Sequence, residues 1–411
     1  MKNPRPATPD AHPARLLTPH AGDAPASAAH GSPRGLTPQM SPEVSARENS
    51  PPQPLAPARW DWKEVHRVLV VRLRSIGDAV LSTPALHALR RFLPEAEIDL
   101  LLEDWVAPLL ENSPDVDRVI TVERSNMSSR LAVARRLRAP RYDVAYNLHG
   151  GSTASLLVRA TGARHRVGYA SYGHARLHNH AAPHPAAIWG RDKLHSAEQQ
   201  LALVGWTGVP VTDRPASRLA VSDKTRTRAA ERLRAARLDP SRPLALFHPA
   251  AAFATKTWDA ANFALVADDV AQRGFAVTAV AAPHESEVLR ALASAARSPV
   301  TTFDDLPLSE LAALAERAGL FVGNDSGVAH IAAAMRVPSV VVFGSSNVAH
   351  WRPWTEAPAE VVREEMPCAP CPGYTCSEFA EPECTRRVPV ERVVAAVGRV
   401  LARSQAAPSG G

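Results

Sequence analysis

A turn of small and polar residues between two apolar segments is the part of the chain best suited to bind phosphate. This turn, 323–327 with the sequence GNDSG, follows the apolar run 320–322 and precedes a predicted helix over 328–335. Free N–H groups and the positive end of the dipole at a helix N-terminus attract anions. His330 lies one helical turn beyond Ser326 and is expected to face the same opening. Glycine turns also join strands to helices in ordinary parallel sheets, so the turn alone leaves that structural interpretation open.

A second polar turn lies near residue 75. The aliphatic run 68–71 is typical of a strand buried on both faces of a parallel sheet, and the segment 72–78, RLRSIGD, follows it. A helix is expected over 79–92. Within it, Thr83 and Pro84 could form a cap and a first helical residue, or could kink the helix.

Strands alternate with helices along the remaining chain, which predicts an α/β fold with parallel sheets. The expected strands are 98–102, 119–122, 144–148, 244–247, 275–280, 320–322 and 340–343, and the expected helices are 131–137, 259–272, 285–296, 308–318 and 389–402. Two Rossmann-like domains, 62–222 and 244–404, are predicted, with a polar linker over 223–243. Ligands bind beyond the carboxyl ends of such strands, so Asp78 and Asp325 are expected on opposite walls of a central cleft.

Composition limits the class of protein. The chain has 411 residues, 45% of them apolar and 21% charged, which is ordinary for a globular enzyme of two or three domains. It has no run of 18 apolar residues and no signal peptide at its N-terminus. Residues 1–58 hold 13 of the 37 prolines and little aliphatic periodicity, so we expect a disordered Pro-rich tail there. The net charge of +6 suits an anionic partner, but no array of arginines and aromatics indicates nucleic acid.

These two turns and their surroundings resemble a known family. The segment 72–86 is similar to the N-terminal signature of glycosyltransferase family 9, the bacterial ADP-heptose:lipopolysaccharide heptosyltransferases. The segments 323–330, 340–344 and 351–354 resemble the donor-binding signature and its continuation. The resemblance runs from about residue 66 to 402. It implies a GT-B fold and a metal-independent, inverting transfer, with the acceptor in the N-terminal domain and the nucleotide sugar in the C-terminal domain.

On the acceptor side, the resemblance implies that Asp78 is the catalytic base. An inverting transfer needs a base beside the acceptor hydroxyl, on the face opposite the leaving diphosphate. The alternative is that Asp78 only caps the following helix. Arg74 and Gly77, in the same signature, and His149 and Gly150, at the end of strand 144–148, are assigned to the acceptor side. His149 could equally be a polar strand-end residue without a role.

On the donor side, positive charge must stabilise the leaving diphosphate. Lys256 resembles the lysine of the family's phosphate-binding loop, with Thr255 beside it as a hydroxyl donor. A solvated loop lysine is the alternative. Donor binding is further assigned to the backbone N–H groups of Ser326, Gly327 and Val328, and to His330, which is expected to face the same opening. Asp325 is expected to orient the loop or to reach the sugar, and Glu285 to bind the ribose hydroxyls.

Four cysteines are clustered in the loop 366–385. Cys368, Cys371, Cys376 and Cys384 have the spacing C-x2-C-x4-C-x7-C. Clustered cysteines in a cytosolic protein favour a metal over disulfides, so a structural zinc or iron is one interpretation. Four reduced cysteines in a surface loop are the other. No cofactor is expected for catalysis.

Three functions compete at this point. The first is transfer of heptose from ADP-heptose to the lipid A-core of lipopolysaccharide, by a cytoplasmic enzyme attached transiently to the inner membrane surface. The second is transfer of heptose to a protein. The third is a catalytically silent relative that only binds a nucleotide sugar. The presence of Gly77, Asp78 and Lys256 argues against the third.

Overall fold

The computed structural model describes residues 51–124, 126–371 and 374–406. Of the tail expected over residues 1–58, residues 1–50 lie outside the described part of the chain. Residues 51–58 are described, and they pack on the folded chain. The Gln53 N–H donates to Thr212 Oγ1 (2.7 Å), and the Leu55 N–H donates to the Gly205 carbonyl (3.1 Å). The ordered structure therefore begins before Trp60.

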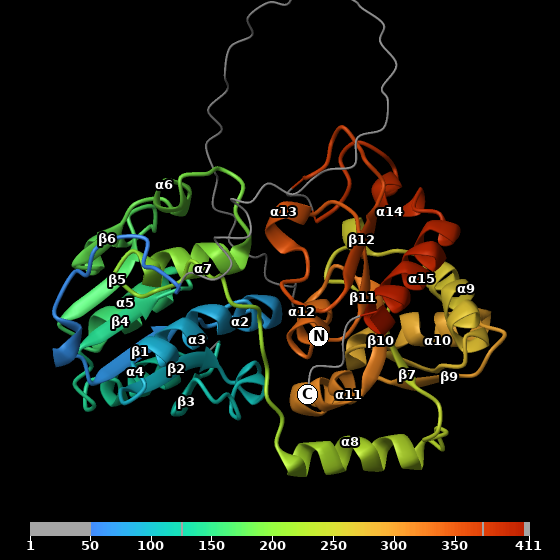
Figure 1. Ribbon diagram of the computed structural model, residues 1–411, viewed down its shortest axis with the longest axis horizontal. Helices are drawn as coiled ribbons and strands as arrows, with labels where there is room; N and C mark the ends of the chain where they lie inside the picture. The colour runs from blue at the N-terminus through green and yellow to red at the C-terminus, as the bar shows by residue number, and fades with distance from the viewer. Residues whose placement is uncertain (1–50, 125, 372–373, 407–411) are drawn as a thin grey trace, which may run out of the picture. The chain divides into compact units, whose positions relative to one another are not determined.

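The first half of the chain forms one six-stranded parallel sheet in the order β3-β2-β1-β4-β5-β6 (Figure 1). Its strands are β1 (Arg67–Val71), β2 (Glu97–Glu103), β3 (Arg118–Val122), β4 (Val144–Asn147), β5 (His165–Tyr169) and β6 (His180–Ala182). Its α-helices are α2 (Ile76–Val80), α3 (Thr83–Phe92), α4 (Met127–Arg136), α5 (Ser152–Ala160), α6 (Pro185–Trp189) and α7 (Ser196–Gly205), and its 3-10 turns are η1 (Trp62–Glu64), η2 (Ala107–Leu109) and η3 (Ala175–Leu177).

The helix expected over 79–92 is two helices. The first, α2, begins at Ile76, and a capping box joins Ser75 to Asp78. The second, α3, begins at Thr83 with Pro84 in its first turn, where a missing N–H is harmless. Pro84 therefore starts a helix and does not kink one. Asp78 lies inside the first turn of α2, so its carboxylate projects where the strand β1 ends.

The second half forms another six-stranded parallel sheet, in the order β12-β11-β10-β7-β8-β9. Its strands are β7 (Leu244–His248), β8 (Ala276–Val280), β9 (Val300–Phe303), β10 (Ala318–Asn324), β11 (Ser339–Phe343) and β12 (Ala359–Arg363). Its α-helices are α9 (Ala260–Gln272), α10 (Ser286–Ala295), α11 (Leu308–Glu316), α12 (Gly327–Ala334), α13 (Val348–Trp351), α14 (Glu383–Arg386) and α15 (Val390–Ala406), and its 3-10 turns are η4 (Ala254–Lys256) and η5 (Pro283–Glu285).

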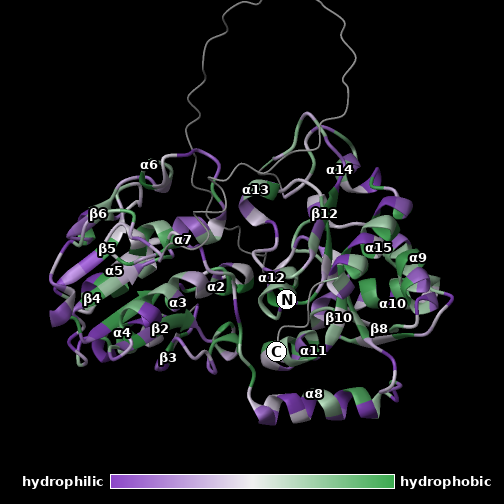
Figure 2. Cartoon of the chain, in the orientation of Figure 1, coloured by the Kyte–Doolittle hydropathy of each residue, from purple (hydrophilic) through white to green (hydrophobic). Residues whose placement is uncertain are grey.

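The segment expected to be a polar linker contains a helix, α8 (Asp223–Ala235). Hydrophilic and hydrophobic residues alternate along it in Figure 2. It buries Ala229 and Leu233, and Arg226, one turn before Ala229 on the same face, pairs with Glu316 of α11 (2.7 Å). A narrow apolar stripe is enough to fix this helix against the second half of the chain.

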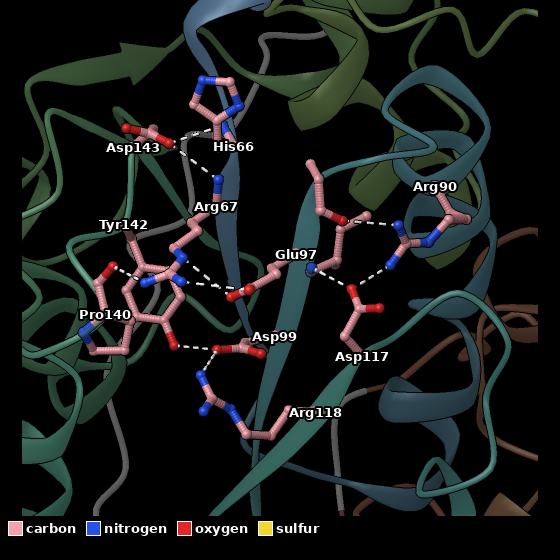
Figure 3. Close-up of polar contacts among 12 residues, drawn as sticks. His66, Arg67, Arg90, Glu97, Asp99, Asp117, Arg118, Pro140, Tyr142 and Asp143 are labelled. Carbon is pink, nitrogen blue, oxygen red and sulfur yellow. Dashed lines mark hydrogen bonds and ion pairs between the residues drawn. The ribbon is translucent and has the colours of Figure 1, made fainter.

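A network of charged side chains joins the strands of the first sheet at their amino ends (Figure 3). Asp143 accepts from the backbone N–H groups of His66 (2.8 Å) and Arg67 (3.0 Å). Asp99 pairs with Arg118 (2.5 Å), and burial raises the pKa of the neighbouring Tyr142. This end is opposite to the carboxyl ends of the strands, so its charges serve strand pairing and not the site.

The buried apolar core is continuous between the two halves. One cluster of buried side chains includes Val70 and Leu86 of the first half together with Leu311 and Phe321 of the second. No helix among the described residues is long and apolar enough to span a membrane. The α/β fold with two parallel sheets predicted from the sequence is confirmed.

Candidate active site

A cavity of about 240 Å³ opens at the carboxyl ends of the strands of the first sheet. Its walls come from both halves of the chain. Polar and aromatic side chains dominate its lining, which includes Arg72, Asp78, His149, Tyr172, Gln199, Gln200, His350 and Trp351. A small, largely polar cavity next to a carboxylate is suited to bind a hydroxylated molecule.

Asp78 is held in place by three donors. The guanidinium of Arg72, at the end of β1, donates to the Asp78 carboxylate and to the Leu148 carbonyl. The other carboxylate oxygen accepts from the N–H and the hydroxyl of Ser75, both at 3.2 Å. The carboxylate is about one-fifth exposed. It is therefore oriented and still accessible, as a general base must be. The Asp78 carboxylate also completes the capping box of α2. A role as helix cap is therefore compatible with a role as base.

The arginine that pairs with Asp78 is Arg72. The acceptor-side role assigned to Arg74 from the sequence stays a prediction. The Arg74 guanidinium pairs with Glu103 (3.7 Å), on another strand end. Only Leu73 lies between these two arginines in the sequence. No signal in the sequence separates them.

His149 and Gly150 follow β4 at the cavity wall. Burial, together with the charge of Arg72, lowers the pKa of His149 to about 4, so this imidazole is neutral at pH 7. Gly150 has a φ of 83°, and a Cβ there would lie 2.7 Å from the Tyr172 ring. Both features shape the wall around Asp78.

The two signature turns contact each other. A Cβ on Gly77 would lie 2.7 Å from the His330 ring, and a Cβ on Gly327 would lie 2.8 Å from Ile76. The helices α2 and α12 can approach this closely only because both positions are glycine. His330 is 4% exposed, and burial lowers its pKa. The negative charges of Asp325 and Asp78 raise this pKa, but by less than burial lowers it. A neutral His330 therefore lies where the two turns meet.

The N-terminus of α12 is the expected anion site. Ser326 is its N-cap, and the Ser326 hydroxyl accepts from the Ala329 N–H (3.4 Å). This bond leaves the N–H groups of Gly327 and Val328 as the candidates for phosphate, with the positive end of the helix dipole behind them.

Lys256 and Asp325 form an ion pair beside this helix. Lys256 Nζ lies 2.9 Å from Asp325 Oδ2, and the Ser346 hydroxyl donates to the same carboxylate. Asp325 is 5% exposed, whereas the lysine side chain is about one-fifth exposed. The lysine is therefore held by a buried carboxylate and is not the solvated loop lysine that was the alternative.

Two further donor-side candidates have other roles in the structure. Thr255 is 1% exposed, and its hydroxyl accepts from Ser345 (3.0 Å), so it joins two loops. Glu285 is half-buried and accepts from the Ala282 N–H (3.0 Å), which closes the turn η5. The donor-binding role of both side chains stays a prediction.

The four cysteines line a second, smaller cavity of about 60 Å³, beside Thr255 and Ser345. All four are free thiols. Burial raises the pKa of the Cys384 thiol, and Cys371, Cys368 and Cys376 raise it further. Within the described ranges, no three His, Cys, Asp or Glu side chains are placed to hold a metal ion. The four thiols therefore line one cavity, and the structural zinc or iron that is one interpretation of their spacing stays a prediction.

Comparisons with known proteins place this geometry in context. Residues 130–380 match the family model described as glycosyltransferase family 9 (heptosyltransferase). Lipopolysaccharide heptosyltransferase 3 of Escherichia coli K12 is 30% identical over 299 residues, which cover 69% of this chain and 84% of that protein.

Two solved structures share the fold. A family 9 glycosyl transferase from Veillonella parvula DSM 2008 is 22% identical with a TM-score of 0.73, over 82% of this chain and 98% of that one. The E. coli ADP-heptose lps heptosyltransferase II is 23% identical with a TM-score of 0.69, over 82% and 99%. These likenesses confirm the predicted GT-B arrangement of two Rossmann-like domains.

Proposed function

The chain belongs to glycosyltransferase family 9, and from this premise we propose that it transfers a heptose from ADP-heptose to the inner core of lipopolysaccharide. The name of the E. coli relative supports the acceptor, and that of the second solved structure supports the donor. The observation that carries the proposal is the oriented, accessible carboxylate of Asp78 beside a polar cavity, with Lys256 and the N-terminus of α12 near the second signature turn.

The proposed reaction is a single displacement. Asp78 takes the proton of an acceptor hydroxyl, and the hydroxyl oxygen attacks the anomeric carbon of the heptose. The bond from that carbon to the diphosphate oxygen breaks on the opposite face, and ADP leaves with the electron pair. The configuration at the anomeric carbon is thereby inverted.

The leaving diphosphate is stabilised by groups of the chain. Lys256 supplies a positive charge, and the N–H groups of Gly327 and Val328 supply fixed dipoles. Asp325 holds the lysine before the donor binds (2.9 Å), so little reorganisation is needed. We propose that no metal ion takes part in this step.

The acceptor side also implies a location. A lipid-linked acceptor is presented at a membrane surface, and the net charge of +6 favours an anionic one. We therefore propose that the protein acts in the cytoplasm as a peripheral protein of the inner membrane.

The experiment measures ADP release by the purified protein. The donor is ADP-heptose, and the acceptor is a truncated lipopolysaccharide whose inner core is deficient in heptose. We expect release that depends on the acceptor, that persists in EDTA, and that falls by about two or more orders of magnitude in Asp78→Asn. UDP-sugars are the donor control. Release from Asp78→Asn at the wild-type rate would mean that another residue is the base, and binding of no nucleotide sugar would refute the function.

A further inference from the structure

Gln200 is a buried residue without a role in the transfer step proposed above. It lies in the second turn of α7 and is 5% exposed. It lines the cavity that holds Asp78. Among the residues that the structure describes, neither the oxygen nor the nitrogen of its carboxamide has a hydrogen-bond partner. A buried amide without any partner is rare in native proteins and costs free energy, so its presence needs an explanation.

A neighbouring amide shows that this part of the fold can satisfy such groups. Asn147, at the end of β4, is fully buried. Its nitrogen donates to Ser155 (3.0 Å), and its oxygen accepts from the N–H groups of His149 (3.1 Å) and Gly150 (2.9 Å). The unpaired amide of Gln200 is therefore specific to that position and is not a general feature of the region.

The surroundings of Gln200 indicate the chemistry of the missing partner. The same wall carries the neutral polar side chains of Ser196, Gln199 and Tyr172. Burial raises the pKa of Tyr172 to about 12, so its hydroxyl is protonated. The charged pair of the cavity, Arg72 and Asp78, is already internally neutralised. A wall of neutral groups that both donate and accept matches sugar hydroxyls, which also do both, better than phosphate or carboxylate.

We propose that Gln200 is an acceptor-binding residue and that the acceptor group in this cavity is a sugar ring. When the acceptor enters, the carboxamide turns toward the cavity and pairs with a sugar hydroxyl, while Asp78 takes the proton of the reacting hydroxyl. This inference rests on the proposed function and makes it more specific, because it names a residue that would recognise the acceptor.

The test is Gln200→Met, which keeps the length of the side chain and removes its polar atoms. We expect the KM for the truncated lipopolysaccharide to rise about tenfold or more, because a site built to pair with a hydroxyl loses that pair. The KM for ADP-heptose and the kcat at saturating acceptor should stay near wild type. The thermal midpoint of the free protein should not fall, since no hydrogen bond is lost.

Thr278→Val is the matched control. Thr278 Oγ1, in β8, is also buried without a partner in the described part of the chain, and it lies outside the cavity. This variant should leave both KM values unchanged and should raise the midpoint or leave it unchanged. Gln200→Glu keeps the shape and replaces the amide donor, so it should show the same acceptor-selective loss if Gln200→Met does not fold.

Two outcomes of these kinetic and stability measurements would overturn the inference. An unchanged acceptor KM in both Gln200 variants would show that the amide does not contact the acceptor. The second outcome is a thermal midpoint several degrees lower in Gln200→Met but unchanged in Thr278→Val, with kcat/KM lowered equally for both substrates. It would show that the amide stabilises the fold and does not bind the acceptor. Calorimetric binding of the deacylated core oligosaccharide, without any donor, tests Gln200 even if the wild type releases no ADP. Binding to the wild type that is lost in Gln200→Met supports the inference, and equal binding, or no binding to the wild type, refutes it.

Discussion

At the scale of single residues, each of the two charges proposed to act in the transfer is already paired in the free protein. Asp78 is held by Arg72, and Lys256 is held by Asp325. These pairs fix the side chains before substrate arrives, which reduces the reorganisation that the reaction would require.

We predict that Lys256→Met lowers kcat/KM for ADP-heptose by about 100- to 1000-fold, the usual effect of removing one group that stabilises a developing negative charge. ADP release at varied donor concentration measures it. Lys224→Met is the matched control, because that lysine is exposed at the start of α8. Equal loss in the two variants would contradict a specific role for Lys256.

At the scale of elements, the donor side depends on contacts between loops that follow different strands. The turn η4 carries Lys256 after β7, and Gly344 follows β11. A Cβ on Gly344 would lie 2.2 Å from the Thr255 carbonyl oxygen, which also accepts from the Ser345 N–H (3.1 Å). The buried Thr255 thus belongs to the joint between these loops, and the joint positions the lysine.

We predict that Gly344→Ala lowers the free energy of unfolding by about 1–3 kcal/mol, as overpacking usually does, and raises the KM for ADP-heptose. Urea unfolding and initial rates measure the two effects. In Gly398→Ala, inside α15, the nearest atom to the new Cβ is 3.7 Å away. That control should be more stable by about 0.5–1 kcal/mol, the usual gain of alanine over glycine in a helix. Wild-type values for Gly344→Ala would refute the proposed joint.

At the scale of the whole molecule, His195 links the two halves of the chain. Its Nδ1 accepts from the Ala197 N–H (3.1 Å) at the start of α7, and its Nε2 lies 2.8 Å from the Arg352 carbonyl. The ring also stacks on Trp354 at 4.6 Å. These contacts require a neutral ring that carries its proton on Nε2, because protonation of Nδ1 would abolish the cap.

Burial lowers the pKa of His195 to about 3, from 6.5 in the unfolded chain. The unfolded state therefore binds this proton first, and the stability that the neutral ring provides is complete above pH 6.5 and is lost as the pH falls toward 3. When the pH is lowered from 7 to 5, His195 alone should lower the free energy of unfolding by about 2 kcal/mol.

We predict that His195→Gln has a smaller fall in unfolding free energy between pH 7 and pH 5, since it lacks that group. Urea unfolding at the two pH values measures it. His66→Gln changes an exposed side chain and is the control. The same pH dependence in wild type and His195→Gln would show that the ring is not held neutral.

Most of the fold could be predicted from the sequence, because strands buried on both faces are rich in consecutive apolar residues. The runs that became β1, β2, β4, β7, β10 and β11 are of this kind. The strands that were missed, β5, β6, β9 and β12, lie at or near the sheet edges and include polar residues. The helix α8 was missed because only two of its residues are buried.

The sequence by itself determined the two signature turns, the candidate base and the candidate lysine, because the residue type and its place after a strand are local properties. Only the tertiary structure decided the partners: Arg72 for Asp78, Ser345 for the Thr255 hydroxyl, and none among the described residues for the Gln200 amide. Hydrogen bonds and burial depend on residues that are far apart in the chain, and their pairing is fixed only when the two sheets and their loops pack together.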